Sequence, residues 1–240
     1  MLKKLKRIVK IVQNYFKNGS QNVFFSIGEN CLADNILNRY EIKSFSSPFS
    51  SGRSNIEYIL KFEQEGYEGF VDKSFLKYEK VGNSEVARNK KYVETKNKYN
   101  SLCTNGFEFT HHDVISDVKV RNTIIRRCNR LLNISNKNIY MLYHHRLCNE
   151  TDESLLVEDL KKLKHIYENR HNKVFIYMFT QVIVNDPSER TISHNVVSGI
   201  NIYKLNTLDE WAGDDEDILW ARCDDDLISD MIKDIKANAQ

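Results

Sequence analysis

Apolar and polar residues alternate along the chain in blocks of two kinds, which predict strands and helices in turn. Short runs rich in β-branched and aromatic residues predict buried strands, and these runs fall at residues 23–27, 138–143, 173–184 and 199–205. Apolar positions three and four residues apart predict amphipathic helices, at residues 31–37, 55–65, 114–134, 154–168 and 227–236. This alternation favours an α/β layered domain with a mainly parallel sheet flanked by helices, a Rossmann-like arrangement.

The stretch from residue 41 to residue 113 shows weaker periodicity. Glu41–Phe45 is predicted to be a second short strand, and residues 46–54 form a Ser/Gly-rich loop around Pro48. Residues 67–105 interleave aromatic residues with lysines but carry no nucleic-acid-binding motif. We therefore expect a less regular insertion near residues 67–105 and no nucleic-acid partner.

A strand is predicted at residues 107–111, and it runs into a corner before the long helix 114–134. The inward positions of that helix are predicted to be Val114, Val118, Ile125, Cys128 and Leu132. Its opposite face carries several arginines, which are solvated in the simplest interpretation.

Residues 1–20 form a basic segment ahead of the remaining single catalytic domain, residues 21–240. The segment holds six basic and no acidic side chains, and its apolar residues fall on one helical face. Such a helix could lie on an anionic membrane surface through residues 2–17. Alternatively, it packs on the domain with its lysines in water. Residues 207–230 hold ten acidic side chains and one basic side chain, and we expect a solvated surface there.

Composition places the chain among ordinary globular proteins. Its 240 residues are 41% hydrophobic and 28% charged, which fits one domain with a sizeable core. Five cysteines at irregular spacing favour a reducing compartment over a disulfide framework. No apolar run approaches the length of about 18 residues that a transmembrane helix needs. We expect a cytoplasmic protein, with a peripheral position at the inner membrane face as the alternative.

The corner between the first strand and the first helix carries the main candidate for chemistry. Gly28 permits a tight turn after the strand, and Asn30 can cap a helix that begins near Cys31. A helix N-terminus favours the thiolate, and the N–H groups at Cys31 and Leu32, with Asn30, could bind an oxyanion. The competing interpretation is a small buried hydrophobic residue, since cysteine outside disulfides is usually that.

Histidines that follow predicted strands are the candidate bases for Cys31. His112 would deprotonate the thiol, and Asp113 would orient its imidazole. Neighbouring strand residues point to opposite faces, so only one of His111 and His112 can easily reach the site. His144 ends its strand in the same way and is a further alternative base. In the simpler interpretation, Asp113 only caps the following helix. No ligand spacing typical of zinc is present, so we expect no metal.

The segment from Ser26 to Phe49 resembles the opening of a bacterial family catalogued as papain-like cysteine peptidases. Members carry a strand ending in Ser-x-Gly-x-x-Cys, a helix, a Ser-x-Pro-Phe element, a later His-Asp pair and an Arg-rich helix. The matching residues are Ser26, Gly28, Cys31, Ser46, Pro48, Phe49, His112, Asp113 and the region 126–130. The resemblance favours His112 as the base.

Three features of the sequence bear on the substrate. If Cys31 is catalytic, the loop with Ser46, Pro48 and Phe49 is placed to form a wall of its pocket. Ser50 and Ser51 stand where family members usually have Asp-Trp, so substrate selection is expected to differ. The papain-type Cys-Gly-Ser-Cys-Trp sequence is absent, which gives the peptidase label little weight.

The resemblance also implies a setting in bacterial surface-polysaccharide or capsule synthesis. Other capsule enzymes that carry a cysteine and are described as papain-like are coenzyme A-binding acetyltransferases. We therefore expect a cysteine-dependent acyltransferase that acts on a surface glycan or its precursor. It would need no cofactor, would take acyl-coenzyme A as a donor substrate, and would use a glycan or a small molecule as acyl acceptor. A peptidase or esterase is the alternative enzyme, and a non-catalytic glycan- or membrane-binding module is the alternative of another class.

Overall fold

A computed structural model describes residues 21–96, 99–208 and 224–239 of the protein. The predicted N-terminal helix and most of the acidic segment, residues 209–223, lie outside these ranges. Among the helices of the described ranges, none is both long enough and apolar enough to cross a membrane.

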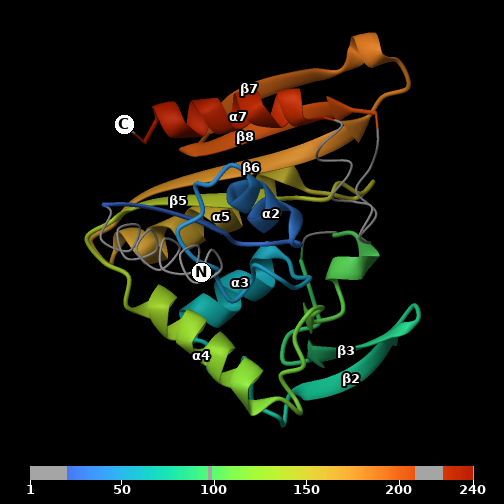
Figure 1. The fold of residues 1–240 in the computed structure, drawn as a ribbon, viewed down its shortest axis with the longest axis vertical. Helices are drawn as coiled ribbons and strands as arrows, with labels where there is room; N and C mark the ends of the chain where they lie inside the picture. Colours follow the sequence, from blue (N-terminus) through green and yellow to red (C-terminus); the bar gives the residue numbers. More distant parts are fainter. Residues whose placement is uncertain (1–20, 97–98, 209–223, 240) are drawn as a thin grey trace, which may run out of the picture.

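Five strands form the main sheet, sheet A, in the order β1-β5-β6-β8-β7 (Figure 1). Their bounds are β1 Asn22–Ser26, β5 Asn138–His144, β6 Lys173–Ile183, β8 Ile200–Thr207 and β7 Thr191–Val197. The first four run parallel, and β7 pairs antiparallel with β8 as an edge strand. The mainly parallel sheet predicted from the sequence is confirmed. Its register places the carboxyl end of β1 beside that of β5, with Ser26 opposite Leu142.

Helices cover both faces of sheet A (Figure 1). The helix bounds are α2 Leu32–Arg39, α3 Ile56–Gln64, α4 Val118–Leu132, α5 Glu153–Glu168 and α7 Asp225–Ala237. α2 and α7 pack on the face that includes Tyr140 and Leu142. α3, α4 and α5 contribute to the larger cluster on the other face, with Ile139 and Met141. Because β5 is buried on both faces, its sequence is continuously apolar.

A second sheet, sheet B, has three antiparallel strands in the order β2-β3-β4 (Figure 1). β2 (Leu76–Val81) and β3 (Ser84–Asn89) form a hairpin, and β4 (Phe107–Phe109) pairs with β3. The segment expected to be a less regular insertion therefore contains a regular hairpin. Its sequence signal is the two-residue turn Gly82–Asn83 between two strand-like runs.

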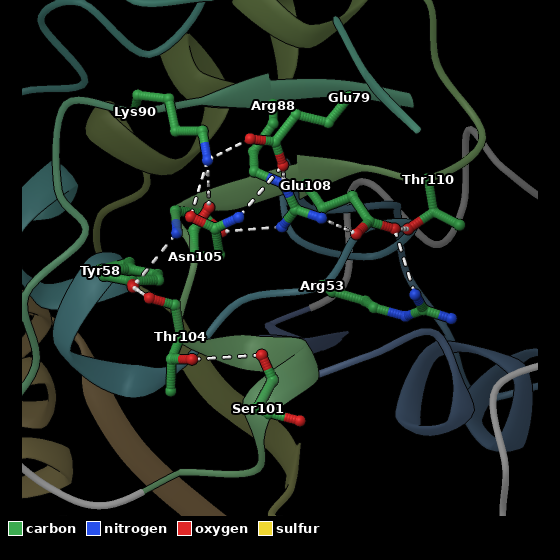
Figure 2. A network of polar contacts seen from close by, with 11 residues as sticks. Arg53, Tyr58, Glu79, Arg88, Lys90, Ser101, Thr104, Asn105, Glu108 and Thr110 are labelled. Atoms are coloured by element: carbon green, nitrogen blue, oxygen red, sulfur yellow. Dashed lines mark hydrogen bonds and ion pairs between the residues drawn. The ribbon is translucent and has the colours of Figure 1, made fainter. Parts of the chain in front are cut away.

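A buried ion-pair network ties sheet B to the loop that precedes α3 (Figure 2). The carboxylate of Glu108 in β4 is 2.5 Å from the guanidinium of Arg88 and 3.5 Å from that of Arg53. The backbones of Arg53 and Glu108 also exchange two hydrogen bonds, of 3.0 and 2.9 Å. Arg88 reaches Glu79 of β2 at 2.6 Å. Each buried charge has a partner of opposite sign, as burial requires.

Two strand expectations are corrected by the structure. Glu41–Phe45 is not a strand, although Ser44 exchanges hydrogen bonds with Phe24 through its backbone N–H and its hydroxyl. β7 is an additional strand that the sequence pattern does not predict. Most of its side chains are exposed, so it shows neither an apolar run nor a clear alternation.

The long helix also differs from expectation. It begins at Val118 rather than near Val114, because Asp117 caps it by accepting the N–H groups of the second and third helical residues. The buried positions are Ile124, Cys128 and Leu131. Of the predicted inward positions within the helix, Cys128 is buried and Leu132 packs against the core. Val118 is 57% exposed and Ile125 is 38% exposed, so the predicted inward face is wrong at these two positions.

Candidate active site

The corner that carries Cys31 connects β1 to α2, as the sequence predicts. Gly28 follows the strand with φ of +101°, and a Cβ atom there would lie 2.6 Å from Oγ of Ser54. The close approach of Ser54, whose N–H donates to the carbonyl of Glu29 at 2.8 Å, therefore requires glycine. Cys31 is the half-buried N-cap residue of α2. It thus lies at the positive end of the helix dipole.

A buried chain of hydrogen bonds holds Asn30 in this corner. Its Oδ1 accepts the N–H of Leu32 at 3.0 Å, so its amide nitrogen donates to Nδ1 of His144 at 2.9 Å. The ring proton of His144 is therefore on Nε2, and the side chain of Gln181 acts on the ring by raising its pKa, against the larger effect of burial. Gln181 in turn donates to Thr207 at 3.0 Å. The chain crosses the carboxyl ends of β8, β6, β5 and β1 and ends at the first turn of α2.

His144, the alternative base, is part of this support. Burial is the main cause that lowers the pKa of His144 to about 3, and the charge of Arg146 acts in the same direction. The ring stacks on Phe179 with centroids 4.7 Å apart. A fully buried, neutral imidazole whose Nδ1 is occupied suits a positioning role better than proton exchange with a substrate.

Two groups expected to bind an oxyanion are already hydrogen bonded. The N–H of Leu32 donates to Asn30, and the amide of Asn30 donates to His144. Both residues are buried. In this conformation both donors are engaged within the protein, and Asn30 would have to rotate before either group could bind an oxyanion.

His112 lies just after β4 of sheet B, not at the carboxyl edge of sheet A. The strand ends at Phe109, and the N–H of His112 donates to the Phe109 carbonyl at 3.3 Å in a turn. Burial, and then the charge of Arg127, lower the pKa of the half-buried His112 below its usual 6.5. Within the described part of the chain, its buried Nε2 has no hydrogen-bond partner. A neutral imidazole with an unoccupied nitrogen has the properties of a general base.

Asp113 does not hydrogen bond to His112 within the described residues. The partners of its carboxylate are the N–H groups of Ile115 and Ser116 and the hydroxyl groups of Ser116 and Tyr78. Burial raises the pKa of Asp113. The hydrogen bonds, of which the one from the Ser116 hydroxyl has the largest effect, outweigh burial and lower this pKa to about 2. Asp113 thus closes the turn that precedes the N-cap of α4. His111 is exposed on the adjoining turn.

Arg127 of α4 connects the surroundings of His112 with those of Cys31. Its guanidinium donates to the carbonyl of Ser47 at 3.5 Å. Its charge acts on His112 and also on Asp34, which lies one turn after Cys31 in α2. Burial lowers the pKa of Arg127, so this arginine is not the solvated residue of the simplest interpretation. The charge of this guanidinium therefore acts on both the turn with His112 and the first turn of α2.

The loop expected to form a pocket wall is packed into the core. Phe49 is fully buried, and its ring lies 5.8–5.9 Å, between centroids, from those of Tyr67, Phe70 and Phe107. Pro48 is also buried, whereas Ser46 is half-buried. Phe49 and Pro48 thus anchor the loop and do not face a substrate in this conformation.

Ser26, the serine before Gly28, fastens the same loop beneath the corner. Its carbonyl accepts the hydroxyl of Ser47 at 2.6 Å, and its own hydroxyl donates to Asp34 at 3.1 Å. Lys43 pairs with the other oxygen of Asp34 at 2.5 Å. The Ser-x-Gly pattern therefore has a structural explanation in the packing of the corner.

The sequence patterns point to the pair His144 and His145 but not to Glu29. The carboxylate of Glu29 is fully buried beside Cys31 and accepts a hydrogen bond from Nδ1 of His145 at 2.7 Å. The sequence signal for Glu29 is that a charged residue stands in a tight turn between two apolar segments. If such a side chain points inward, it needs buried hydrogen-bond or ion-pair partners.

Comparison with known proteins identifies the family. Residues 22–187 match the family described as "Putative papain-like cysteine peptidase (DUF1796)". No curated protein and no solved structure gives a significant match. The family match covers well over half of the chain, so the protein belongs to this family, whose description indicates an enzyme with a cysteine nucleophile.

Proposed function

We propose that the protein is a cysteine-dependent acyl-transferring enzyme whose nucleophile is Cys31. The observation that carries the proposal is a half-exposed cysteine at the N-terminus of α2, directly after a parallel strand. A helix N-terminus favours the thiolate, and α/β sheets bind ligands beyond the carboxyl ends of their strands. The turn is held by Gly28, Asn30 and His144, and the family description supports a cysteine nucleophile.

His112 is the base in this proposal. Its neutral imidazole takes the thiol proton, and the thiolate attacks the acyl carbon, so that an S–C bond forms as the bond to the leaving group breaks. The imidazolium then protonates the leaving group. An acceptor hydroxyl attacks the thioester and gives its proton to His112, the S–C bond breaks, and the imidazolium returns the proton to the Cys31 thiolate. The buried Nε2 of His112, which has no hydrogen-bond partner among the described residues, supports the assignment.

For the donor we propose an acyl thioester such as acyl-coenzyme A, and for the acceptor a hydroxyl of a bacterial surface glycan or its precursor. A peptidase or esterase would use the same nucleophile and base, with water as the acceptor. Contact of residues 2–17 with an anionic membrane would bring the enzyme to a membrane-bound acceptor. Those residues lie outside the described part of the chain.

Loading with acetyl-coenzyme A tests the proposal. The peptide that contains Cys31 should gain the mass of one acetyl group, and Cys31→Ser should abolish this gain. His112→Gln should slow loading by about 10²- to 10⁴-fold, the usual contribution of a general base. His111→Gln is the matched control, because His111 is the exposed neighbour and its loss should leave the rate unchanged.

Two other results would change the assignment. Cys31-dependent hydrolysis of peptides or esters, without loading by acetyl-coenzyme A, would make the protein a hydrolase. A Cys31 that neither loads nor reacts with iodoacetamide faster than in the unfolded chain would indicate a non-catalytic binding module.

A further inference from the structure

A second hydrogen-bonded group of reactive side chains lies beside the chain of Asn30 and His144. It consists of Glu29, His145, Thr151 and Cys148. Glu29 and His145 are fully buried, whereas Thr151 and Cys148 are half-buried. The group therefore runs from the interior of the protein to its surface, along the segment that links β5 to α5.

At the buried end, Glu29 fixes the orientation of His145. One carboxylate oxygen accepts Nδ1 of His145 at 2.7 Å and the hydroxyl of Tyr143 at 2.9 Å. The other oxygen accepts the N–H of Arg146 at 2.9 Å. A carboxylate that accepts three donors leaves Nδ1 of His145 as the protonated nitrogen. Nε2 then points away from Glu29 as an acceptor.

At the other end, the hydroxyl of Thr151 joins the imidazole to a thiol. Its Oγ1 lies 3.2 Å from Nε2 of His145, 3.0 Å from the backbone nitrogen of Cys148 and 3.4 Å from Sγ of Cys148. A hydroxyl has one proton and two lone pairs. In a neutral imidazole protonated on Nδ1, Nε2 accepts the hydroxyl proton of Thr151, which leaves its two lone pairs for the backbone N–H and the S–H of Cys148. All donors then run in one direction, from thiol to hydroxyl to imidazole to carboxylate.

We propose that Cys148 is a second reactive thiol, deprotonated through Thr151 by the buried imidazole and open to small carbon electrophiles. Carboxylate, imidazole and hydroxyl in this order are the parts that activate nucleophiles in catalytic triads. Here a half-buried thiol is added at the exposed end. Neither Cys31 nor His112 takes part in this arrangement.

The reaction balances with an alkyl halide as the electrophile. Thr151 gives its proton to Nε2 of His145 and receives the proton of the Cys148 thiol. The thiolate attacks the carbon, the S–C bond forms, the carbon–halogen bond breaks and halide leaves. The proton stays on the imidazolium, beside the carboxylate of Glu29. With an acyl thioester, the departing thiolate would take that proton.

Two other cysteines provide internal references. Cys103 and Cys128 are 3% and 4% exposed, and burial raises the pKa of both thiols. Both are therefore expected to be inert in the folded protein. Cys148 combines access to solvent with a connected base.

Alkylation of the folded protein by iodoacetamide, read by peptide mass spectrometry, tests the proposal at each cysteine separately. We expect native Cys148 to react faster than the same residue in urea-unfolded protein at the same pH. Thr151→Val keeps the shape of the side chain but removes the hydroxyl. It should lower the native rate by about 100-fold, the lower end of the range for a lost general base. Thr151→Ser keeps the hydroxyl and should retain the rate.

Two controls distinguish a thiol activated through Thr151 from a thiol that is exposed by another change in the protein. Cys31→Ser should leave the rate at Cys148 unchanged, because the two thiols are proposed to react independently. Melting temperatures of the Thr151 variants report local destabilisation, which would expose Cys148 and raise its rate rather than lower it. A native Cys148 no faster than in the unfolded chain, or a wild-type rate in Thr151→Val, would overturn the proposal.

Discussion

Two adjacent histidines at the end of β5 have different roles because their side chains leave the strand in opposite directions. His144 stacks on Phe179 and accepts a hydrogen bond from Asn30. His145 lies on the other side and donates to Glu29. Glu29 and Asn30 are the two residues that precede Cys31. One strand end therefore fixes both residues of the turn that presents the proposed nucleophile.

The rate of Cys31 acylation should depend on pH through His112. Burial, and then Arg127, lower the pKa of His112, and a base must be neutral to act. The rate should therefore persist at neutral pH and fall only below the usual histidine pKa of 6.5. Arg127→Gln removes a repelling charge, so it should move this acid limb to higher pH. An acid limb that does not move would assign the titration to another group.

Phe49→Ala tests whether the loop residue belongs to the core. Removal of a fully buried phenylalanine should lower the free energy of unfolding by about 3–5 kcal/mol, measured by urea denaturation. Phe75→Ala is the matched control, because Phe75 is 36% exposed and should cost much less. A Phe49→Ala protein with full stability but weaker substrate binding would indicate that Phe49 lines the substrate pocket and does not belong to the core.

At the scale of secondary structure, the elements with clear periodicity are those that the sequence predicts. β5 is a continuous apolar run because both of its faces are buried, and α3 is framed by the capping side chain of Asn55 and by Gly66. β7 escapes prediction because its exposed side chains carry no hydrophobic pattern. Val118 and Ile125 of α4 are wrongly predicted to face inward because Val114, although buried, belongs to the preceding turn.

The candidate site is predictable only where neighbouring residues define it. Gly28, Asn30 and Cys31 form one local turn, so short-range rules are enough to place the cysteine at a helix N-terminus. The contact of Asn30 with His144 depends on β1 lying beside β5, a pairing between distant segments. The position of His112 depends in turn on the separate antiparallel sheet B. Local patterns do not contain that information.

Gly28→Ala should destabilise the corner between β1 and α2 for two separable reasons. The positive φ costs about 1–2 kcal/mol for a residue with a side chain. The new Cβ would also press on Oγ of Ser54. Gly66→Ala is a reference for a positive φ without a steric clash, since its φ is +63°, against +101° at Gly28, and nothing lies within 4 Å of the added atom.

The double variant Gly28→Ala with Ser54→Ala should recover the steric part, as measured by urea denaturation of all the variants. Equal losses for Gly28→Ala and Gly66→Ala would mean that Ser54 moves aside at no cost. In that case the packing of Ser54 would not be the reason for glycine at position 28.

At the scale of the whole molecule, sheet A separates two hydrophobic clusters, and the candidate site lies where the chain passes from one to the other. β1 contributes Val23 and Phe25 to the cluster that also includes residues of sheet B. α2 contributes Leu32 and Ile36 to the cluster with α7. The corner with Cys31 is thus anchored in both clusters. We expect its geometry to persist until the fold as a whole unfolds.

The stability of the whole fold should decrease with falling pH because of His144. In the folded protein, burial first and neighbouring charges second hold the pKa of His144 at about 3, whereas the unfolded chain has the usual value of 6.5. Between these two values the unfolded state binds one more proton than the folded state, so each pH unit costs at most about 1.4 kcal/mol. The contribution is complete above pH 6.5 and is lost progressively toward pH 3.

His144→Gln lacks the titrating group, so its stability should decline less steeply on acidification. At neutral pH it should be less stable than the wild type, because the hydrogen bonds from Asn30 to Gln181 are disturbed. Urea denaturation of both proteins across this range measures the two slopes, and their difference removes the contribution of the carboxylates that they share. Parallel slopes would mean that His144 is protonated inside the fold, and the hydrogen-bond directions assigned from Asn30 to Gln181 would have to be reversed.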